Sequence, residues 1–354
     1  MKSEQIVLNQ SRNVTLTTYL LEAGGEFGNI PKRPAVLILP GGGYQFCSDR
    51  EADPVACPYL AAGFDAFILR YSVRKDAVWP NPLDDYEQAM QLIRSKAEEW
   101  NIYQDKIAVI GFSAGGHLAA CAATMSVNRP NAAILGYPVT IGDDVRSCNV
   151  TAPDTISAVD KNTCPCFVFA TRTDNLVPIR NSIHFVDALE QNDISFECHI
   201  YSHGPHGFST CDASVQSYDT VIPQRVRSWV PDSIAWLKDI FGEFGNGCLT
   251  QPVCAKRSNG NMDDYLSVDC TFGYLMSKPE AAAVLTPILD KLKKAAASQN
   301  DDQNSQSMDP GAMDPAAMAV LTQRMKLRDL LSFGRAPAEA IEQIDQLLRK
   351  IANT

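Results

Sequence analysis

The chain has 354 residues, of which 45% are hydrophobic and 20% are charged, as in ordinary globular proteins that hold one large domain and a smaller one. The net charge of −10 argues against nucleic acid or an anionic membrane as the main partner. No apolar run has the length of a signal peptide or of a bilayer-spanning helix. The sequence as written is therefore expected to be cytoplasmic, although a leader removed before Met1 would leave no trace.

Apolar runs and helical patterns alternate along the first two thirds of the chain. Residues 14–21 alternate as in a strand, and short apolar runs occur at 35–40, 65–73, 106–113, 132–139, 166–173 and 195–202. Helical spacing marks residues 82–100, 114–125, 178–192 and 226–241. Strands that are apolar on both faces and separated by helices predict an α/β fold, with a mostly parallel central sheet flanked by helices.

The composition changes after residue 241. Residues 242–260 are rich in Gly, Asn and Ser, which is typical of a linker between a main domain, residues 1–241, and a C-terminal region. Residues 261–354 are predicted to form that region, which is small and helical, with a low-complexity loop near 299–316. Such helices need an apolar surface to pack on, so a homo-oligomer formed through them is one expectation.

The 11 cysteines do not indicate a metal site or a disulfide framework. Cys164 and Cys166 lack the Cys-x-x-Cys spacing of redox and zinc sites, and no second Cys or His pair stands nearby at metal-ligand spacing. A chain of this length does not need disulfides to fold. We therefore expect reduced cysteines, no bound metal and no other cofactor.

A candidate nucleophile stands in the stretch GFSAGG, residues 111–116. Gly-x-Ser-x-Gly between an apolar strand and a helix is the context of a nucleophile elbow, in which a serine occupies a tight, strained turn. The helix amino terminus then offers backbone N–H groups where an oxyanion would form. Ser113 is predicted to be the nucleophile and the N–H of Ala114 an oxyanion donor. The alternative is a tight turn without chemistry.

Further oxyanion donors are expected in LPGGGY, residues 39–44, which comes after an early apolar strand. Three glycines let the backbone approach a substrate closely, and we assign the N–H groups of Gly42 and Gly43 as donors. The alternative is a plain glycine-rich turn or a phosphate loop. No Lys-Ser/Thr comes after the glycines, and the spacing is not Gly-x-Gly-x-x-Gly, which disfavours the phosphate loop.

A serine nucleophile also needs a base and an acid that orients it. Asp174 comes after the apolar run 166–173 and is the candidate acid, although an aspartate there could equally cap a helix. The base should come after the last strand, where His203 and His206 stand three residues apart. The other three histidines fall inside helical patterns or within the strand: His117, His184 and His199.

LPGGGY, IGFSAGGHLAA, TRTDNLVP and GPHGF together resemble the α/β-hydrolase superfamily over about residues 14–241. Within it they are similar to bacterial carboxylesterases related to hormone-sensitive lipase and to acetylxylan and feruloyl esterases. The resemblance implies that His206, in the His-Gly-Phe turn, is the base. Pro40 stands where the hormone-sensitive-lipase branch usually has a histidine, which favours the acetylxylan-esterase-like group.

The function expected from the resemblance is a serine carboxylesterase that hydrolyses short-chain acyl esters, with acetyl groups on sugars of plant polysaccharides as one substrate. Tyr44 and Phe46 stand just after the glycines and are candidates for the pocket wall. Three alternatives remain open from the sequence: an arylformamidase-like amidase, a prolyl-oligopeptidase-like peptidase and a non-catalytic binding module.

Overall fold

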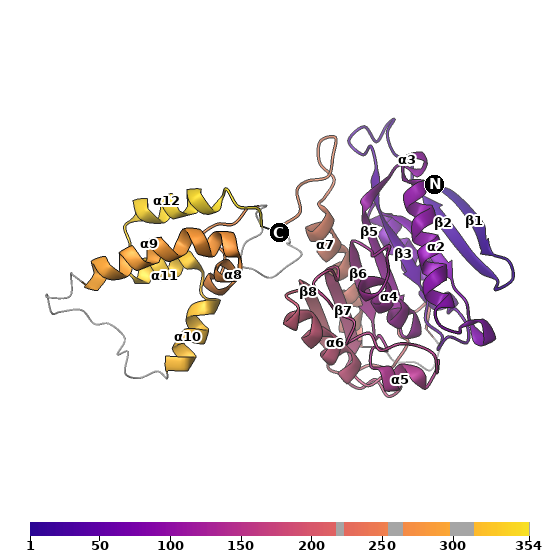
Figure 1. Ribbon diagram of the computed structural model, residues 1–354. Coiled ribbons are helices and arrows are strands. Elements are labelled where there is room, and N and C mark those ends of the chain that lie inside the picture. The colour runs from indigo at the N-terminus through magenta and orange to yellow at the C-terminus, as the bar shows by residue number, and fades with distance from the viewer. Residues whose placement is uncertain (217–222, 254–264, 298–314, 354) are drawn as a thin grey trace. The chain divides into compact units, whose positions relative to one another are not determined.

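The computed structural model describes residues 1–216, 223–253, 265–297 and 315–353. The chain divides into two compact units, residues 1–257 and residues 258–354 (Figure 1). The first unit holds every motif on which the functional prediction depends. Most of the described residues of the second unit lie in helices.

An eight-stranded sheet forms the centre of the first unit, in the order β1-β2-β4-β3-β5-β6-β7-β8. Its strands are β1 (Lys2–Asn9), β2 (Val14–Leu20), β3 (Arg33–Leu39), β4 (Asp65–Arg70), β5 (Ile102–Phe112), β6 (Ala132–Gly136), β7 (Cys166–Thr171) and β8 (Phe196–Tyr201). β1 and β2 run antiparallel to their neighbours, and the pairs from β4 to β8 are parallel. The prediction of a mostly parallel sheet is confirmed.

Helices cover both faces of this sheet (Figure 1). They are α1 (Asp53–Ala61), α2 (Asn81–Ser95), α3 (Ala97–Trp100), α4 (Ala114–Thr124), α5 (Gly142–Arg146), α6 (Arg180–Gln191) and α7 (Trp229–Phe241). Short 3₁₀ turns lie at η1 (Asp49–Glu51), η2 (Arg74–Asp76) and η3 (Gln224–Ser228). Apolar side chains of α2, α4 and α6 belong to one buried cluster, and those of α1 and α7 belong to the other.

The central strand β3 shows why two clusters form. Every residue of β3 is buried, and successive side chains point to opposite faces of the sheet. Leu37 and Leu39 pack in the cluster with α2 and α4, whereas Val36 and Ile38 pack in the cluster with α1 and α7. A strand buried on both faces is therefore visible in the sequence as the continuous apolar run from which it was predicted.

The edge strand β1 was not predicted from the sequence. Five of its eight residues are polar and five are exposed, because β1 pairs along one side only and leaves its surface to solvent. The pairing of β1 with β2 is antiparallel, with Lys2 opposite Leu20 and Ile6 opposite Leu16. A strand whose only apolar run is three residues long gives little signal in a single sequence.

Part of the expected linker packs on the first unit. Phe244 pairs with Leu249 in an isolated bridge, and the Val253 N–H donates to the Asp239 carbonyl of α7 at 2.9 Å. The Arg33 guanidinium lies 5.7 Å from the centre of the Phe244 ring. Residues 242–253 therefore belong to the first unit, and residues 254–260 of the expected linker lie outside the described residues.

The second unit has its own apolar core. Its described helices are α8 (Phe272–Ser277), α9 (Pro279–Ala297), α10 (Pro315–Arg324), α11 (Leu327–Phe333) and α12 (Ala338–Leu348). The core includes Leu266, Leu275, Leu327, Ile341, Ile344 and Leu348. Leu347, next to Leu348 in α12, is 38% exposed and lies outside this core. Nearly all of the expected low-complexity loop, residues 299–316, lies outside the described residues.

The helical pattern at residues 316–333 is interrupted in the structure, where it forms parts of two helices. α10 ends at Arg324 and α11 begins at Leu327, because Lys326 takes an extended conformation and forms an isolated bridge with Thr271. The break lets Leu327 and Leu331 face the core of this unit.

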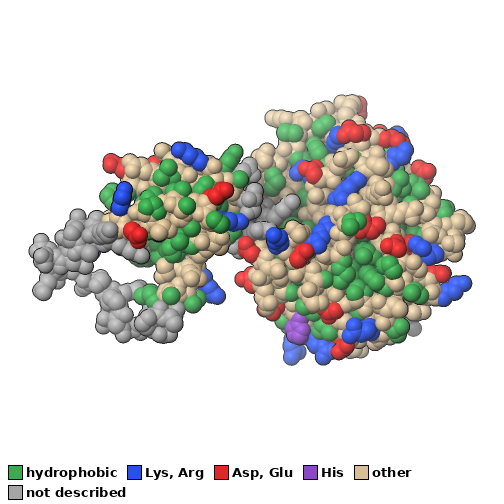
Figure 2. Space-filling model, viewed as in Figure 1, with side chains coloured by type: hydrophobic (Ala, Val, Ile, Leu, Met, Phe, Trp, Pro, Cys, Tyr) green, Lys and Arg blue, Asp and Glu red, His purple; other side chains and the backbone are tan. Residues whose placement is uncertain are grey.

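The surface is charged without a dominant sign on the face shown in Figure 2, where basic and acidic side chains are interspersed over the first unit. Among the described residues, no helix has both the length and the apolar character needed to cross a bilayer.

Candidate active site

Ser113 occupies a sharp turn between β5 and α4. Its backbone dihedrals are φ 53° and ψ −116°, an uncommon conformation for a residue other than glycine, and such residues cost on the order of 1–3 kcal/mol in strain. Close packing of strand and helix holds this geometry. A Cβ added to Gly115 would lie 2.1 Å from the Leu39 carbonyl oxygen, so only glycine fits there. The turn places the serine side chain at the carboxyl end of the parallel strands.

The carboxyl ends of three parallel strands bring the predicted residues together. Ser113 comes directly after β5, Asp174 lies three residues after the end of β7, and His206 lies five residues after the end of β8. Ligand and catalytic groups of open parallel sheets gather at this edge, because the strands all end there and the loops carry the side chains. Residues 93 positions apart, Ser113 and His206, thereby come into contact.

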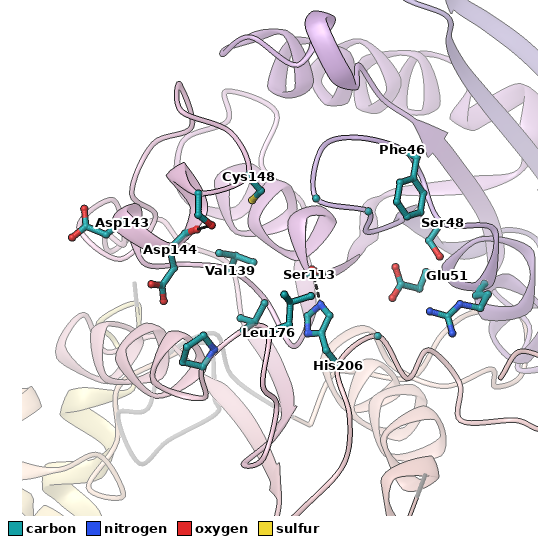
Figure 3. Close-up of a pocket in the computed structure, with 17 residues that line it drawn as sticks. Phe46, Ser48, Glu51, Ser113, Val139, Asp143, Asp144, Cys148, Leu176 and His206 are labelled. Carbon is teal, nitrogen blue, oxygen red and sulfur yellow. Dashed lines mark hydrogen bonds between the residues drawn. The ribbon is translucent and has the colours of Figure 1, made fainter. Parts of the chain in front are cut away.

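A continuous line of hydrogen bonds joins the three side chains. His206 Nδ1 lies 2.6 Å from Asp174 Oδ2, and His206 Nε2 lies 2.9 Å from Ser113 Oγ (Figure 3). A carboxylate only accepts, so Nδ1–H donates to Asp174 and Nε2 is left to accept the Ser113 hydroxyl proton. The arrangement has the geometry of an activated serine nucleophile.

Asp174 is fixed by its other oxygen. Oδ1 accepts the backbone N–H groups of Leu176 and Val177, each at 2.9 Å, and only 1% of the side chain is exposed. Asp174 does not cap a helix, because α6 begins at Arg180 with Ile179 as its N-cap, and Oδ1 instead binds the loop between β7 and α6. The backbone bonds hold the carboxylate in the orientation that meets His206.

Residues 41–43, hereafter the glycine loop, lie beside the nucleophile turn. The Gly41 carbonyl accepts from the Ser48 N–H and the Gly42 carbonyl from the Gln45 N–H, both at 2.9 Å. Within the described residues, the N–H groups of Gly42, Gly43 and Ala114 donate to no acceptor. Ala114 is the first residue of α4, and the first N–H groups of a helix have no partner within the helix. Gly42 has φ +132°, which a residue with a side chain rarely adopts. These three free N–H groups remain the candidates for oxyanion donors.

The prediction that Tyr44 lines the pocket is wrong. Its side chain is fully buried, and its hydroxyl lies 2.6 Å from Nδ1 of His117 in α4. His117 Nε2 lies 2.9 Å from the Pro153 carbonyl, which only accepts, so Nε2 carries the proton and the Tyr44 hydroxyl donates to Nδ1. Burial lowers the pKa of His117 to about 4, which keeps the ring neutral. Tyr44 is thus a buried residue directly after the glycine loop and not part of the pocket wall.

Phe46 does line the pocket and is 56% exposed. The pocket has a volume of about 560 Å³ and also takes in Ser113, His206, Gly42 and Gly43. Figure 3 shows Phe46, Ser48 and Glu51 on one side of Ser113 and Asp143, Asp144 and Cys148 on the other. Leu176, 70% exposed, lies close to Ser113 in the same view.

The individual acidic residues of the pocket wall were not singled out from the sequence. Asp143 and Asp144 lie at the start of α5, and Asp144 Oδ1 accepts from Arg180 at 2.7 Å. On the opposite side, burial raises the pKa of Glu51, while hydrogen bonds from Tyr137 and Gly41 and the charge of His206 act in the lowering direction. Contacts between distant parts of the chain distinguish Asp144 and Glu51 from ordinary surface acids.

The remaining histidines take no part in the line of hydrogen bonds around Ser113. His203 is exposed and lies 3.0 Å, Nδ1 to Oγ, from its neighbour Ser202. His199 lies within β8, where its ring stacks on Phe167 with 5.0 Å between ring centres. Among the described residues, no group of three or more His, Cys, Asp and Glu side chains could hold a metal ion.

The fold and the site both define an α/β hydrolase, and comparison with known proteins agrees. The BD-FAE family matches residues 28–136, and the prolyl oligopeptidase family matches residues 143–223. An α/β hydrolase enzyme from a Medee basin deep-sea metagenome library is 44% identical and has a TM-score of 0.64, over 68% of this chain and 98% of that one. The chain belongs to the α/β-hydrolase family, which confirms the resemblance seen in the sequence.

Two curated relatives carry the names of xylan-acting enzymes. The chain is 32% identical over 211 residues to endo-1,4-beta-xylanase B of Butyrivibrio fibrisolvens, covering 51% of this chain and 33% of that protein. It is 30% identical over 204 residues to an acetylxylan esterase of Xylanibacter ruminicola, covering 51% of this chain and 42% of that protein. The match therefore spans less than half the length of either relative.

Proposed function

We propose that the protein is a serine carboxylesterase in which Ser113 is the nucleophile, His206 the general base and Asp174 the orienting acid. The observation that carries the proposal is the line of hydrogen bonds from Asp174 Oδ2 through His206 to Ser113 Oγ at a pocket of about 560 Å³. Membership of the α/β-hydrolase family supports it, since this fold presents a serine on the same strand-to-helix turn.

The chemistry follows from these positions. Ser113 Oγ attacks the ester carbonyl while His206 Nε2 takes its proton, and the negative charge of the tetrahedral intermediate falls on the former carbonyl oxygen. The N–H groups of Gly42, Gly43 and Ala114 are the proposed donors to that oxygen. His206 then protonates the leaving alcohol, which leaves an acyl group on Ser113. Water, deprotonated by His206, releases the acid and restores the serine.

The proposed substrates are short-chain acyl esters on sugars, with acetylated xylo-oligosaccharides as the first choice. The relatives named as an acetylxylan esterase and a xylanase support this substrate class. The pocket offers an exposed aromatic ring, Phe46, against which an apolar sugar face can pack, and polar groups such as Ser48 and Ser147 on its walls.

One experiment tests the nucleophile and the reaction class together. A fluorophosphonate probe should label the wild-type protein once, on Ser113, and Ser113→Ala should take up no label. Hydrolysis of p-nitrophenyl acetate by Ser113→Ala should fall about 10⁶-fold. Activity near the wild-type level in this variant would contradict the assignment of the nucleophile.

A second candidate function is peptide cleavage, because the prolyl oligopeptidase family matches the segment 143–223 that supplies Asp174 and His206. The same side chains could attack an amide. Rates measured side by side on acetylated xylo-oligosaccharides, N-formylkynurenine and a prolyl peptide amide separate the esterase from an amidase and a peptidase. We expect the acetylated sugar to have the highest kcat/KM.

A further inference from the structure

The Ser113, His206 and Asp174 chemistry gives no role to Glu51, a buried acidic group of the pocket wall. Glu51 ends the 3₁₀ turn η1, lines the pocket and is only 3% exposed. A buried carboxyl group destabilises a protein unless hydrogen bonds replace its lost water. The partners of Glu51 therefore indicate what the buried group does.

Both Glu51 carboxylate oxygens accept a hydrogen bond, and the two donors belong to different parts of the site. Oε2 accepts the backbone N–H of Gly41 at 2.8 Å, and Oε1 accepts the Tyr137 hydroxyl at 2.5 Å. Gly41 directly precedes Gly42 and Gly43, the proposed oxyanion donors. On this side Glu51 fixes the start of the glycine loop.

Tyr137 connects Glu51 to the loop that holds the base. This loop, residues 203–209, is called the histidine loop below. The Tyr137 hydroxyl accepts the backbone N–H of Ser209 at 3.1 Å. The edge of its ring meets His206, with 4.9 Å between ring centres and 68° between ring planes, and it meets Phe208 at 4.6 Å. The Ser209 hydroxyl also donates to the Arg50 carbonyl, next to Glu51.

These contacts form one line from Gly41 through Glu51 and Tyr137 to Ser209. It connects the two loops on either side of Ser113, and it is buried, so water does not compete for its bonds. A carboxylate suits the centre of this line, because it accepts from two donors at once. A glutamine would keep the bond from Gly41 but would present an N–H₂ group to the Tyr137 hydroxyl, which would then lose its acceptor.

We propose that Glu51 is a positioning residue that holds the glycine loop and the histidine loop at a fixed separation, so that the oxyanion donors and His206 meet the same reacting group on Ser113. The inference rests on the proposed function for the roles of these loops. Catalytic groups must be placed within a fraction of an ångström, and a misplacement of about 1 Å can cost on the order of 10²-fold in rate.

The variants are Glu51→Ala, Glu51→Gln and Tyr137→Phe. We expect kcat on p-nitrophenyl acetate to fall about 100-fold in Glu51→Ala and about 10-fold in each of the other two, with KM within twofold of wild type. The partial activity of the glutamine variant is the rescue expected when one of the two bonds survives. The double variant Glu51→Ala with Tyr137→Phe should be no slower than Glu51→Ala alone, because both changes break the same line.

Asp65→Asn is the matched control. Asp65 is also a buried carboxyl that accepts a backbone N–H, from Leu21 at 2.7 Å, but it begins β4 at the opposite end of the parallel strands. Its kcat should stay within twofold of wild type. Active sites are counted by fluorophosphonate incorporation at completion, so that kcat refers to folded protein alone.

The rate constant of fluorophosphonate labelling is the second readout, because it depends on the positioned site and on no particular ester. It should fall in the same order as kcat. If the wild type is labelled but hydrolyses no ester, the proposed function fails while the labelling rates still test Glu51. Two results would overturn the inference. In the first, Glu51→Ala and Tyr137→Phe lower thermal stability but keep kcat and the labelling rate within twofold of wild type. In the second, the decrease in kcat of the double variant equals the product of the decreases in the two single variants.

Discussion

His206 and Asp174 meet through a 2.6 Å hydrogen bond, and the Asp174 oxygen that does not face His206 accepts two backbone N–H groups of its own loop. The carboxylate cannot rotate away from the imidazole without breaking these bonds. The relationship therefore fixes which ring nitrogen carries the proton, and with it the ability of Nε2 to receive the Ser113 proton.

Asp174→Asn should lower kcat on p-nitrophenyl acetate about 10⁴-fold while it leaves the fold intact. The amide keeps one oxygen for the backbone N–H groups of Leu176 and Val177 and turns its N–H₂ group toward His206. Nδ1 must then accept, so Nε2 carries the hydrogen and cannot act as a base. The measurement is kcat/KM from initial rates, normalised by active-site titration.

Asp160→Asn is the control for the aspartate variant. Asp160 is also hydrogen-bonded, to the Arg129 guanidinium at 2.6 Å, but it lies outside the pocket. Its kcat should match the wild type within twofold. An Asp174→Asn enzyme that keeps a tenth or more of the wild-type kcat would show that Asp174 does not set the imidazole tautomer.

His206→Ala and His203→Ala should differ by orders of magnitude. His206 touches Ser113 and Asp174, so its removal should abolish esterase turnover, with a loss of about 10⁶-fold. His203 is exposed and its hydrogen bond is to the neighbouring Ser202, so His203→Ala should keep kcat within twofold. The same p-nitrophenyl acetate assay compares them, and the reverse result would make His203 the base.

The sequence could predict the residues around Ser113 because their signals are local. A serine between two glycines, after an apolar run and before a helical pattern, specifies a turn whose geometry the chain itself enforces through Gly115. The order of strands pointed to Asp174 and to the pair His203 and His206, since each lies just beyond a predicted strand end, and the choice of His206 came from the resemblance to known esterases. The parallel sheet was predictable for the same reason, because buried strands are continuous apolar runs.

Features that depend on distant contacts were not predictable. Glu51 looks like a surface acid in the sequence, and only its bond to Tyr137, 86 residues away, gives it a place in the site. Tyr44 and Phe46 stand two residues apart in a turn, where side-chain directions have no fixed period. One is buried against His117 and the other faces the pocket, so the prediction that placed both in the wall was wrong for Tyr44.

Phe46→Ala and Tyr44→Phe should therefore affect different properties. Removing the exposed Phe46 ring should raise KM for acetylated xylo-oligosaccharides about 5- to 10-fold, because the sugar loses an aromatic surface, while kcat on p-nitrophenyl acetate stays within twofold. Tyr44→Phe leaves His117 Nδ1 buried without its donor and should lower the free energy of unfolding by about 1–3 kcal/mol.

Val127→Ala is the control for Phe46→Ala, since Val127 is 91% exposed and lies outside the pocket wall. Its KM for the oligosaccharide should equal that of the wild type. An unchanged KM in Phe46→Ala would remove Phe46 from the substrate contacts. Thermal and urea unfolding measure the effect of Tyr44→Phe, and a stability equal to wild type would contradict the role of its hydroxyl.

Asp65 should make the first unit less stable as the pH rises. Burial raises the pKa of Asp65 to about 7, although a hydrogen bond from Leu21 and the charge of Arg33 act in the lowering direction. Asp65 Oδ2 has no hydrogen-bond partner among the described residues. The folded protein thus holds a proton that the unfolded chain, with a carboxyl pKa of 3.8, releases. Between about pH 4 and pH 7 the unfolded state binds fewer protons, so the free energy of unfolding falls with increasing pH and levels off above pH 7.

Asp65→Asn cannot titrate and should lose this part of the pH dependence. Each pKa unit corresponds to about 1.4 kcal/mol, so the stability of the wild type relative to the variant should fall by on the order of 2–4 kcal/mol between pH 4.5 and pH 8. Urea unfolding monitored by tryptophan fluorescence measures it, because all four tryptophans, Trp79, Trp100, Trp229 and Trp236, lie in the first unit. Other titrating groups are common to both proteins and cancel in the difference. A difference that does not change with pH would mean that the Asp65 carboxyl is ionised in the folded protein throughout this range.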